Sequence, residues 1–251
     1  MNLKNKRILG INISFYQYQE AIKKIINTSL NNTDLRVSPI ASHSIIEAQN
    51  NSKLKDILNN FDLVLPDGQS LVWAANFLYE NAKRERIYGP DLLLRLCERC
   101  EKEKIRVILY GNHTGLVSHK IRKKYPKLNT VALPDLKYKK INNTDVKYLL
   151  SALNKYKKSI AFIGIGSPAQ HILLAELKQI KMPIVAVGAA FNFIAGVQKQ
   201  APVWMQKYGF EWLFRLINEP QRLWKRYLIY APRFVILVIF QKINFLFNND
   251  K

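Results

Sequence analysis

Residues 61–91 read FDLVLPDGQSLVWAANFLYENAKRERIYGPD, and this stretch decides the fold. The apolar residues 63–65 are typical of a buried strand, which stops at the turn Pro66-Asp67-Gly68. An apolar segment with helical character, residues 71–78, follows at once. A strand that ends directly before a helix points its last side chain into the cleft at the carboxyl edge of an open α/β sheet, where ligands bind.

Asp67 occupies that position, and no cation is adjacent to it in the sequence. The basic residues Lys83, Arg84 and Arg86 follow one helix later and can fold back over the same cleft. A carboxylate that faces cations suits group transfer on an anionic substrate, with a base for the nucleophile and positive charge for the leaving group. The alternative is structural, because Asp-Gly is among the commonest turn dipeptides.

Strand and helix patterns alternate along most of the chain. Strands are expected at residues 8–13, 35–41, 63–65, 106–110, 129–132, 159–163 and 183–187. Helices are expected at residues 18–30, directly after Ser42, which can act as the cap, and at 53–60, 71–78, 91–104, 116–124, 144–155 and 169–178. Such alternation predicts an α/β fold with a mostly parallel, Rossmann-like sheet and helices on both faces.

Residues 201–251 differ from this pattern, so we expect a core of residues 1–200 and a helical C-terminal appendage of residues 201–251. Helices are expected at 202–217 and 219–230, with Asn218 as the cap of the second. Arg215, Arg222 and Arg226 lie among tryptophan and tyrosine residues, a mixture that suits membrane headgroups or single-stranded nucleic acid. The apolar run 234–240 is too short to span a bilayer.

The chain has 251 residues and a net charge of +21, from 39 basic and 18 acidic residues. This excess calls for an anionic partner, which can be nucleic acid, a membrane surface or a phosphorylated substrate. No secretory signal and no apolar run of membrane-spanning length is visible, so we expect a cytoplasmic protein. The two cysteines, Cys97 and Cys100, lie inside a helical pattern and lack a second pair for zinc.

Two glycine-containing turns can bind a nucleotide. Gly164 and Gly166 follow a strand and open a helix, whose amino end favours phosphate, and Gly111 is a weaker copy of this signal. Asn192, between two phenylalanines, can hydrogen-bond a base or a sugar. An ordinary strand–helix turn and a packed core segment explain these residues equally well.

Other catalytic signatures are missing. The four histidines show no metal-ligand spacing, and the chain has no Gly-x-Ser-x-Gly elbow, no Walker-type phosphate loop and no Asp-x-Asp triplet. The Gly164–Gly166 turn lacks the third glycine and the following acid of a dinucleotide site, which disfavours an NAD-type redox enzyme. No metal and no cofactor is therefore expected.

Three segments together resemble the WecG/TagA/CpsF family of bacterial glycosyltransferases. They are LVLPDGQSLVW from Leu63, RIYGPDL from Arg86, and the block VGAAFNFIAGVQKQAPVWMQKYGFEWLFRLINEPQRLWKRY from Val187. The resemblance covers residues 8–235. It implies a membrane-associated, inverting enzyme that moves a sugar from a UDP-sugar to a polyprenyl-diphosphate-linked sugar without a required metal.

The resemblance also assigns residues. It implies that Asp67 is the general base and that Arg86 and Gln170 bind substrate, together with the appendage arginines Arg215, Arg222 and Arg226. Where family members that transfer N-acetylmannosamine carry Thr-x-Asn, this chain has Ser38-Pro39-Ile40, which makes Ser38 a candidate substrate contact. Asn192 stands where Asp is common and His171 where an acid is common, so the donor and acceptor stay open.

The hypothesis is thus a metal-independent transferase for a sugar of the N-acetylhexosamine or uronic acid type, peripheral on the inner face of the cell membrane, in polysaccharide synthesis. Its expected partners are a UDP-sugar, a polyprenyl-diphosphate-linked acceptor and an anionic membrane, without nucleic acid. The sequence leaves open whether the chain forms a homo-oligomer. The alternative is a basic α/β nucleic-acid-binding protein.

Overall fold

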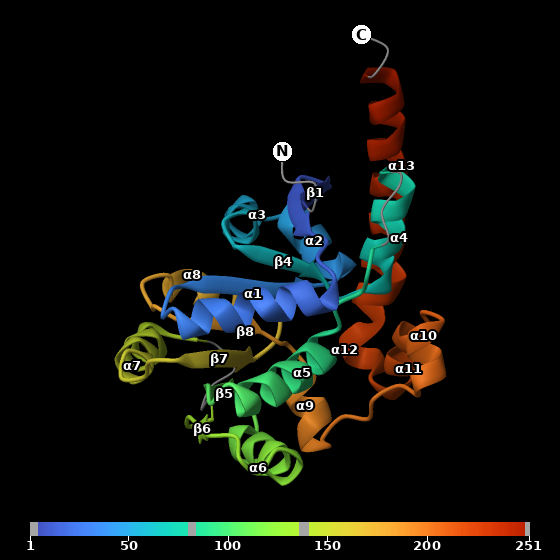
Figure 1. The fold of residues 1–251 in the computed structure, drawn as a ribbon. Helices are drawn as coiled ribbons and strands as arrows, with labels where there is room; N and C mark the ends of the chain where they lie inside the picture. The colour runs from blue at the N-terminus through green and yellow to red at the C-terminus, as the bar shows by residue number, and fades with distance from the viewer. Residues whose placement is uncertain (1–4, 80–83, 136–140, 249–251) are drawn as a thin grey trace.

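The computed structural model describes residues 5–79, 84–135 and 141–248, and within them a central sheet carries the fold (Figure 1). Its six strands are ordered β4-β3-β8-β7-β5-β6, and every neighbouring pair is parallel. The strands are β3 (Leu35–Ile40), β4 (Leu63–Pro66), β5 (Arg106–Gly111), β6 (Thr130–Ala132), β7 (Ser159–Gly164) and β8 (Pro183–Ala186). The predicted α/β class and parallel sheet are confirmed.

The N-terminal strand prediction is wrong in detail. Residues 8–13 are not one strand but the end of β1 (Asn5–Ile8), a turn, and the start of β2 (Ile11–Ser14), which pair antiparallel. Leu9 and Gly10 both have positive φ values, 47° and 78°, and so reverse the chain. Leu9 is an uncommon residue for this conformation, and for that reason the turn was not visible in the sequence.

Helices cover both faces of the sheet (Figure 1). One face packs against α1 (Tyr18–Leu30), α5 (Gly89–Lys102), α6 (Thr114–Lys124) and α9 (Ala190–Ala195). The other packs against α2 (Ser42–Gln49), α3 (Ser52–Asn59), α4 (Gln69–Leu78), α7 (Asn143–Leu153) and α8 (Ala169–Glu176). Ser42 is the first residue of α2 rather than its cap, which is Ala41.

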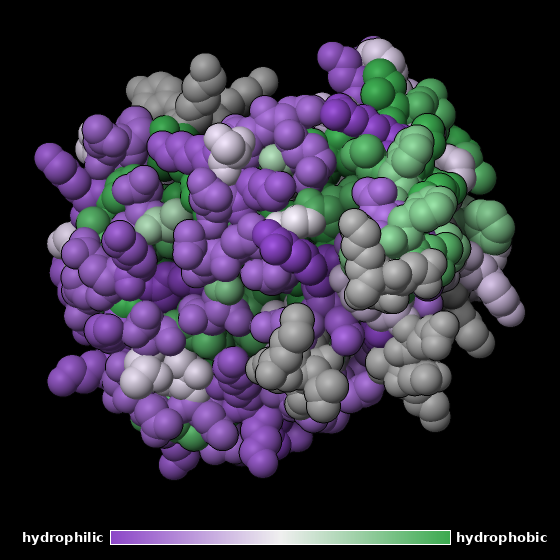
Figure 2. All heavy atoms as spheres, turned by 90° about the horizontal axis from the view of Figure 1, so that it is seen from above, coloured by the Kyte–Doolittle hydropathy of each residue, from purple (hydrophilic) through white to green (hydrophobic). Residues whose placement is uncertain are grey.

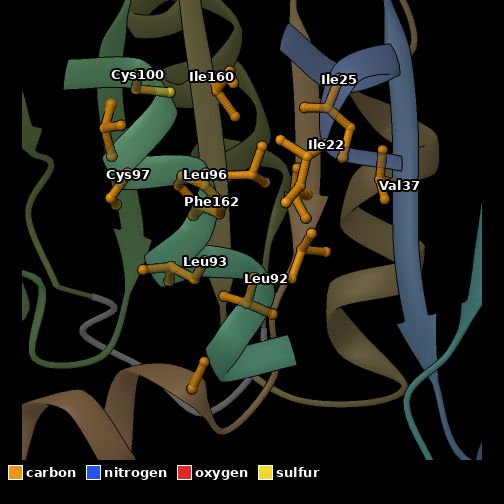
Figure 3. Close-up of a cluster of buried hydrophobic side chains, with 14 of the residues drawn as sticks. Ile22, Ile25, Val37, Leu92, Leu93, Leu96, Cys97, Cys100, Ile160 and Phe162 are labelled. Atoms are coloured by element: carbon orange, nitrogen blue, oxygen red, sulfur yellow. The ribbon is translucent and has the colours of Figure 1, made fainter. Parts of the chain in front are cut away.

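Alternating strand residues build the core on the two faces. Val37 of β3 and Ile160 and Phe162 of β7 point to the α1–α5 side, where Figure 3 shows them among Ile22, Ile25 and the apolar face of α5. Cys97 and Cys100 lie in this cluster, fully buried and free. Burial raises the pKa of Cys100 to about 12, so both cysteines act as core residues rather than as a redox or zinc site.

The C-terminal region is helical, as predicted, but its divisions differ. The expected helix 202–217 is two helices, α10 (Val203–Lys207) and α11 (Glu211–Asn218), because Gly209 turns the chain with a φ of 79°. The next helix, α12 (Pro220–Trp224), is capped by Glu219 and not by Asn218. A π-helical turn, η1 (Lys225–Tyr230), then joins α12 to α13 (Ala231–Asn248).

Together α12, η1 and α13 form one long helix that projects from the body of the protein (Figure 1). This helix, Pro220–Phe247, contains an 18-residue window with a mean hydropathy of 1.4, so by length and composition alone it could cross a membrane. The helix is longer than the uninterrupted apolar run 234–240, because polar residues such as Gln241 interrupt the run without ending the helix. Apolar side chains gather on this side of the molecule (Figure 2).

The lower part of α13 is also part of the core. Phe234 and Val238 are buried with Ile8 of β1 and Leu71 of α4 in one cluster. Gln241 extends this contact, because its side chain bonds the backbone of Leu9. A division at residue 200 therefore marks a change of pattern in the sequence, while the packing runs across it.

Gly111 and Gly164 lie where the close packing of the sheet and its covering helix leaves no room for a side chain. A Cβ atom on Gly111 would lie 2.5 Å from the carbonyl oxygen of Gly164 on the neighbouring strand, and Gly111 has a φ of 148°. A Cβ atom on Gly164 would lie 2.4 Å from the ring of Phe191, which is fully buried. Close packing therefore explains glycine at both positions.

We expect Gly111→Ala to lower the free energy of unfolding by about 1–3 kcal/mol, because alanine there combines a glycine-type backbone with a clash against a neighbouring strand. Gly115→Ala is the matched control, since Gly115 lies in α6 with open space around its Cβ position. It should raise stability by about 0.4–1 kcal/mol. Chemical denaturation of both variants measures the difference, and equal stabilities would contradict this account of Gly111.

Candidate active site

Asp67 directly follows β4 and is fastened at the carboxyl edge of the sheet. Its backbone N–H donates to the carbonyl of Ile40 at the end of β3, at 2.9 Å. Its Oδ1 accepts the backbone N–H of Gly89 at 2.7 Å. Burial raises the pKa of the Asp67 carboxyl, while Arg86 and the Gly89 N–H act in the opposite direction. The result is a fixed carboxylate with an elevated proton affinity.

A first pocket of about 210 Å³ opens beside Asp67, at the carboxyl ends of five strands. Its walls come from residues at or just after the ends of β3, β4, β5, β7 and β8, and from the C-terminal region. The polar and charged side chains on it are His43, Ser44, Asp67, Asn112, Ser167, Gln170, Asn192, Arg215, Arg222 and Arg226. Such a position is the usual ligand site of an open α/β sheet.

A second pocket of about 420 Å³ lies on the other side of Asp67, and it is largely aromatic and aliphatic. It runs between α4 and the C-terminal helices, with Trp73, Trp212 and Tyr227 in its walls. The rings of Trp212 and Tyr227 lie 5.9 Å apart. A pocket of this composition suits a ligand with an apolar part.

The two pockets share a wall made of Ala41, His43, Asp67, Arg215 and Arg226. A carboxylate, an imidazole and two guanidinium groups thus stand between a polar chamber and an apolar one. A molecule in each chamber would meet its neighbour at Asp67. The arrangement is that of a site for transfer between two ligands.

The three C-terminal arginines, Arg215, Arg222 and Arg226, all line the first pocket. Arg226 is close to the other two cations. Burial lowers the pKa of its guanidinium, and the charges of Arg222 and Arg215 lower it further, while the charge of Glu47 raises it. Arg222 is paired with Glu219 on its own helix. Arg215 Nε is buried without a hydrogen-bond partner among the described residues. A cluster of cations with unused donors favours a multiply charged anion.

His43, near the start of α2, faces the same arginines and was not recognised as a site residue from the sequence. Burial lowers the pKa of its imidazole well below the usual value, and the charges of Arg226, Arg215 and Arg222 lower it further. His43 is thus a neutral hydrogen-bonding group near neutral pH. Its position just after the end of β3 was the available signal.

Arg86 bridges the core and the appendage. Its Nε donates to the backbone carbonyl of Asp67, and a terminal nitrogen pairs with Glu211 Oε2 of α11 at 2.6 Å. Arg86 lines the second pocket and is not among the residues that line the first. Of the basic residues expected to fold back over the cleft, Arg86 lines the second pocket. Arg84 instead donates to Asn76 and to the backbone carbonyl of Tyr79. Lys83 lies outside the described residues.

The remaining candidates divide into two groups. Gly164, Gly166, Gln170 and Asn192 line the first pocket, and Gln170 Oε1 accepts the backbone N–H of Gly188 at 3.0 Å, which fixes the turn after β8. Gly166 has a φ of 86° and open space around its Cβ position, so it is free to face a ligand. Gly111 is not among the pocket residues, and its packing against Gly164 accounts for it.

Ser38 also lies away from both pockets. It is fully buried in β3, and its Oγ lies 2.9 Å from Nδ1 of His171, a buried residue of α8. Burial lowers the pKa of His171 to about 4, so the pair is neutral and supports the sheet. Ser38 lines neither the first nor the second pocket. Its direct contact with a substrate therefore stays a prediction that this geometry does not support.

No group of three or more His, Cys, Asp or Glu side chains in residues 5–79, 84–135 and 141–248 is arranged to hold a metal ion. The sequence also missed Glu211 and Tyr88, which bond each other beside Asp67 at 3.1 Å. Glu211 lies 125 residues from its partner Arg86, and no local pattern reveals such a contact.

Comparisons with known proteins show to which family the chain belongs. A family model described as "Glycosyl transferase WecG/TagA/CpsF family" matches residues 6–247. The chain is 28% identical over 195 residues (75% of this chain, 73% of the relative) to a Bacillus subtilis (strain 168) N-acetylglucosaminyldiphosphoundecaprenol N-acetyl-beta-D-mannosaminyltransferase. A protein of the same name from Bacillus spizizenii is 25% identical over 198 residues (77% and 74%). The chain therefore belongs to the WecG/TagA/CpsF family of glycosyltransferases.

Proposed function

We propose that this protein transfers a sugar from a UDP-sugar to a polyprenyl-diphosphate-linked saccharide, with inversion at the anomeric carbon. The observation that carries the proposal is the wall shared by the two pockets, in which Asp67 stands between a cationic chamber and an apolar one. Membership of the family supports glycosyl transfer, and the printed names of the two Bacillus relatives support a lipid-diphosphate acceptor. The nucleic-acid-binding alternative has no such support.

The first pocket suits the donor. A nucleoside diphosphate has two adjacent negative groups, and Arg215, Arg222 and Arg226 offer several donors to them. The amino end of α8, after Gly166, adds a partial positive charge. Gln170 and Asn192 are within the same pocket and can contact the nucleoside or the donor sugar.

The second pocket suits the acceptor. Its aromatic walls can pack against the first isoprene units and the sugar ring, with the acceptor hydroxyl directed at Asp67. Asp67 takes the hydroxyl proton as the oxygen attacks the anomeric carbon, and the bond from that carbon to the diphosphate breaks. Burial raises the pKa of Asp67 in the direction of neutral pH, which favours its action as a general base. The arginines stabilise the charge that develops on the departing UDP.

The proposal requires no metal ion. In metal-dependent sugar transfer a divalent cation balances the leaving diphosphate, and here three guanidinium groups already line the pocket. The same arrangement leaves the sugar identity open between an N-acetylhexosamine and a uronic acid. The relatives' names favour N-acetylmannosamine, while Ile40 and Asn192 mark differences from the family pattern near the site.

We also propose attachment to the inner face of the cell membrane through the C-terminal helices. Ile236, Ile239 and Phe240 of α13 and Trp204 of α10 are exposed. Figure 2 shows apolar side chains gathered on the side of the molecule where the C-terminal helix lies. Arg233 and Lys242 on the same helix would favour anionic headgroups, at about 1 kcal/mol for each basic residue near the surface. A membrane-bound enzyme would meet its lipid-linked acceptor at the mouth of the apolar pocket.

Asp67→Asn should keep the fold and the affinity for UDP but lower kcat by ~10²–10⁴-fold, because the amide cannot accept the hydroxyl proton. Turnover with a UDP-sugar and a polyprenyl-diphosphate sugar measures kcat, and calorimetry measures UDP binding. Asp56→Asn, on an exposed part of α3, is the control for a lost carboxylate. Full activity of Asp67→Asn would overturn the assignment.

Transfer by the wild-type protein should persist in excess chelator, because the arginines balance the leaving diphosphate. The initial rate with and without EDTA is the measurement, and a manganese-dependent glycosyltransferase serves as the control for effective chelation. A rate that falls in EDTA and returns with magnesium or manganese would contradict a metal-independent reaction.

The double variant Ile236→Glu with Phe240→Glu should weaken binding to anionic vesicles at least about tenfold, because two exposed apolar side chains on one side of α13 become charged. Co-sedimentation with phosphatidylglycerol vesicles is the measurement. The matched control, Leu116→Glu with Ile172→Glu, makes the same change at exposed residues of α6 and α8. Equal losses in both double variants would argue against attachment through α13.

A further inference from the structure

Glu211 is an acidic side chain that is buried against the core although it belongs to the appendage. It lies on α11, and its side chain is 11% exposed. Its Oε2 pairs with Arg86 at 2.6 Å, and its Oε1 accepts the hydroxyl of Tyr88 at 3.1 Å. A buried carboxylate is costly unless it is paired, so both contacts hold it in one place.

Both partners of Glu211 lead to Asp67. Arg86 donates from Nε to the backbone carbonyl of Asp67, and its guanidinium stacks on the Tyr88 ring at 4.3 Å. Tyr88 directly precedes Gly89, whose N–H holds Oδ1 of Asp67. One appendage carboxylate is therefore connected to the backbone of the candidate base and to the group that orients its side chain.

We propose that Glu211 is a positioning residue of the transfer reaction, which fixes Arg86 and Tyr88 so that docking of α11 on the core completes the surroundings of the Asp67 carboxylate. This inference rests on the proposed role of Asp67 as general base. It gives the appendage a part in assembling the site that is separate from membrane attachment and from the three arginines. The competing explanation is that Glu211 only ties α11 to the core.

The charges around Asp67 separate the two explanations. Arg86 lowers the pKa of the Asp67 carboxyl and Glu211 raises it, so Glu211 offsets part of the effect of Arg86. The other charged or titratable groups that face Asp67 come from α1, α2, the segment before α5, α11 and η1: Tyr18, His43, Tyr88, Arg215 and Arg226. Without the Glu211 charge, Arg86 would hold the pKa of Asp67 lower.

The test uses full-length Glu211→Gln, which keeps the shape of the side chain and removes its charge. Because the reaction needs ionised Asp67, kcat/KM falls on the acidic side of its pH profile as Asp67 takes up a proton. We expect the acidic limb of Glu211→Gln to move to lower pH. We also expect kcat to fall by up to about 10²-fold with little change in KM for the UDP-sugar, since the base is less well placed.

Arg86→Gln provides a second variant with the opposite expectation. Removing this cation raises the pKa of Asp67, so the acidic limb should move to higher pH. Opposite displacements in the two variants cannot come from a simple loss of docking. If circular dichroism shows that Glu211→Gln is unfolded, the test rests on Arg86→Gln alone. An acidic limb of Arg86→Gln at the same pH as in the wild type would then overturn the inference.

Glu219→Gln is the matched control. Glu219 also belongs to the appendage and contacts the core, because it accepts the side-chain amide of Gln198 at 2.9 Å, but it is not among the charges that act on Asp67. The acidic limb of the kcat/KM profile of Glu219→Gln should lie at the same pH as that of the wild type.

The outcomes separate this inference from the proposed function. A fully active Asp67→Asn variant overturns both. An inactive Asp67→Asn, together with folded Glu211→Gln and Arg86→Gln whose acidic limbs match the wild type, overturns only the positioning role and leaves Glu211 as a docking contact.

Discussion

The guanidinium of Arg86 joins three parts of the molecule that are far apart in the sequence. It holds the backbone carbonyl of Asp67 at the end of β4, stacks on Tyr88 before α5, and pairs with Glu211 of α11. A buried cation needs partners on all sides, and each of these groups is needed to balance it. The candidate base and α11 of the C-terminal region are therefore linked through the same ion pair.

The contact of Arg86 with Glu211 also helps to explain why Asp67 borders two pockets rather than one open cleft. The sheet edge alone supplies Asp67, the turn at Gly166 and the amide of Gln170, as open α/β sheets commonly do. The C-terminal helices close over that edge and add arginines on one side and aromatic walls on the other. The polar chamber and the apolar chamber are thus products of the contact between core and appendage.

The glycines show how a correct local pattern can have another cause. Gly111 and Gly164 are the last residues of β5 and β7, and Gly166 follows β7, at positions where a ligand can approach the backbone. Close packing explains the first two, because a side chain on Gly111 would clash with Gly164 and a side chain on Gly164 would clash with Phe191. Of the three glycines, Gly166 alone has free space around its Cβ position. Sequence spacing cannot distinguish these cases, because the neighbour that occupies the space comes from another strand or helix.

The sequence by itself determined the alternation of strands and helices around the main sheet, the parallel direction of that sheet, and the strand-end position of Asp67, because these follow from local apolar periodicity and turn residues. It also indicated the family, through motifs at Leu63, Arg86 and Val187. Only the tertiary structure decided that His43 and Glu211 face Asp67, and that Ser38 is turned into the core. Those facts depend on contacts between residues distant in the chain, and on burial, which no local pattern encodes.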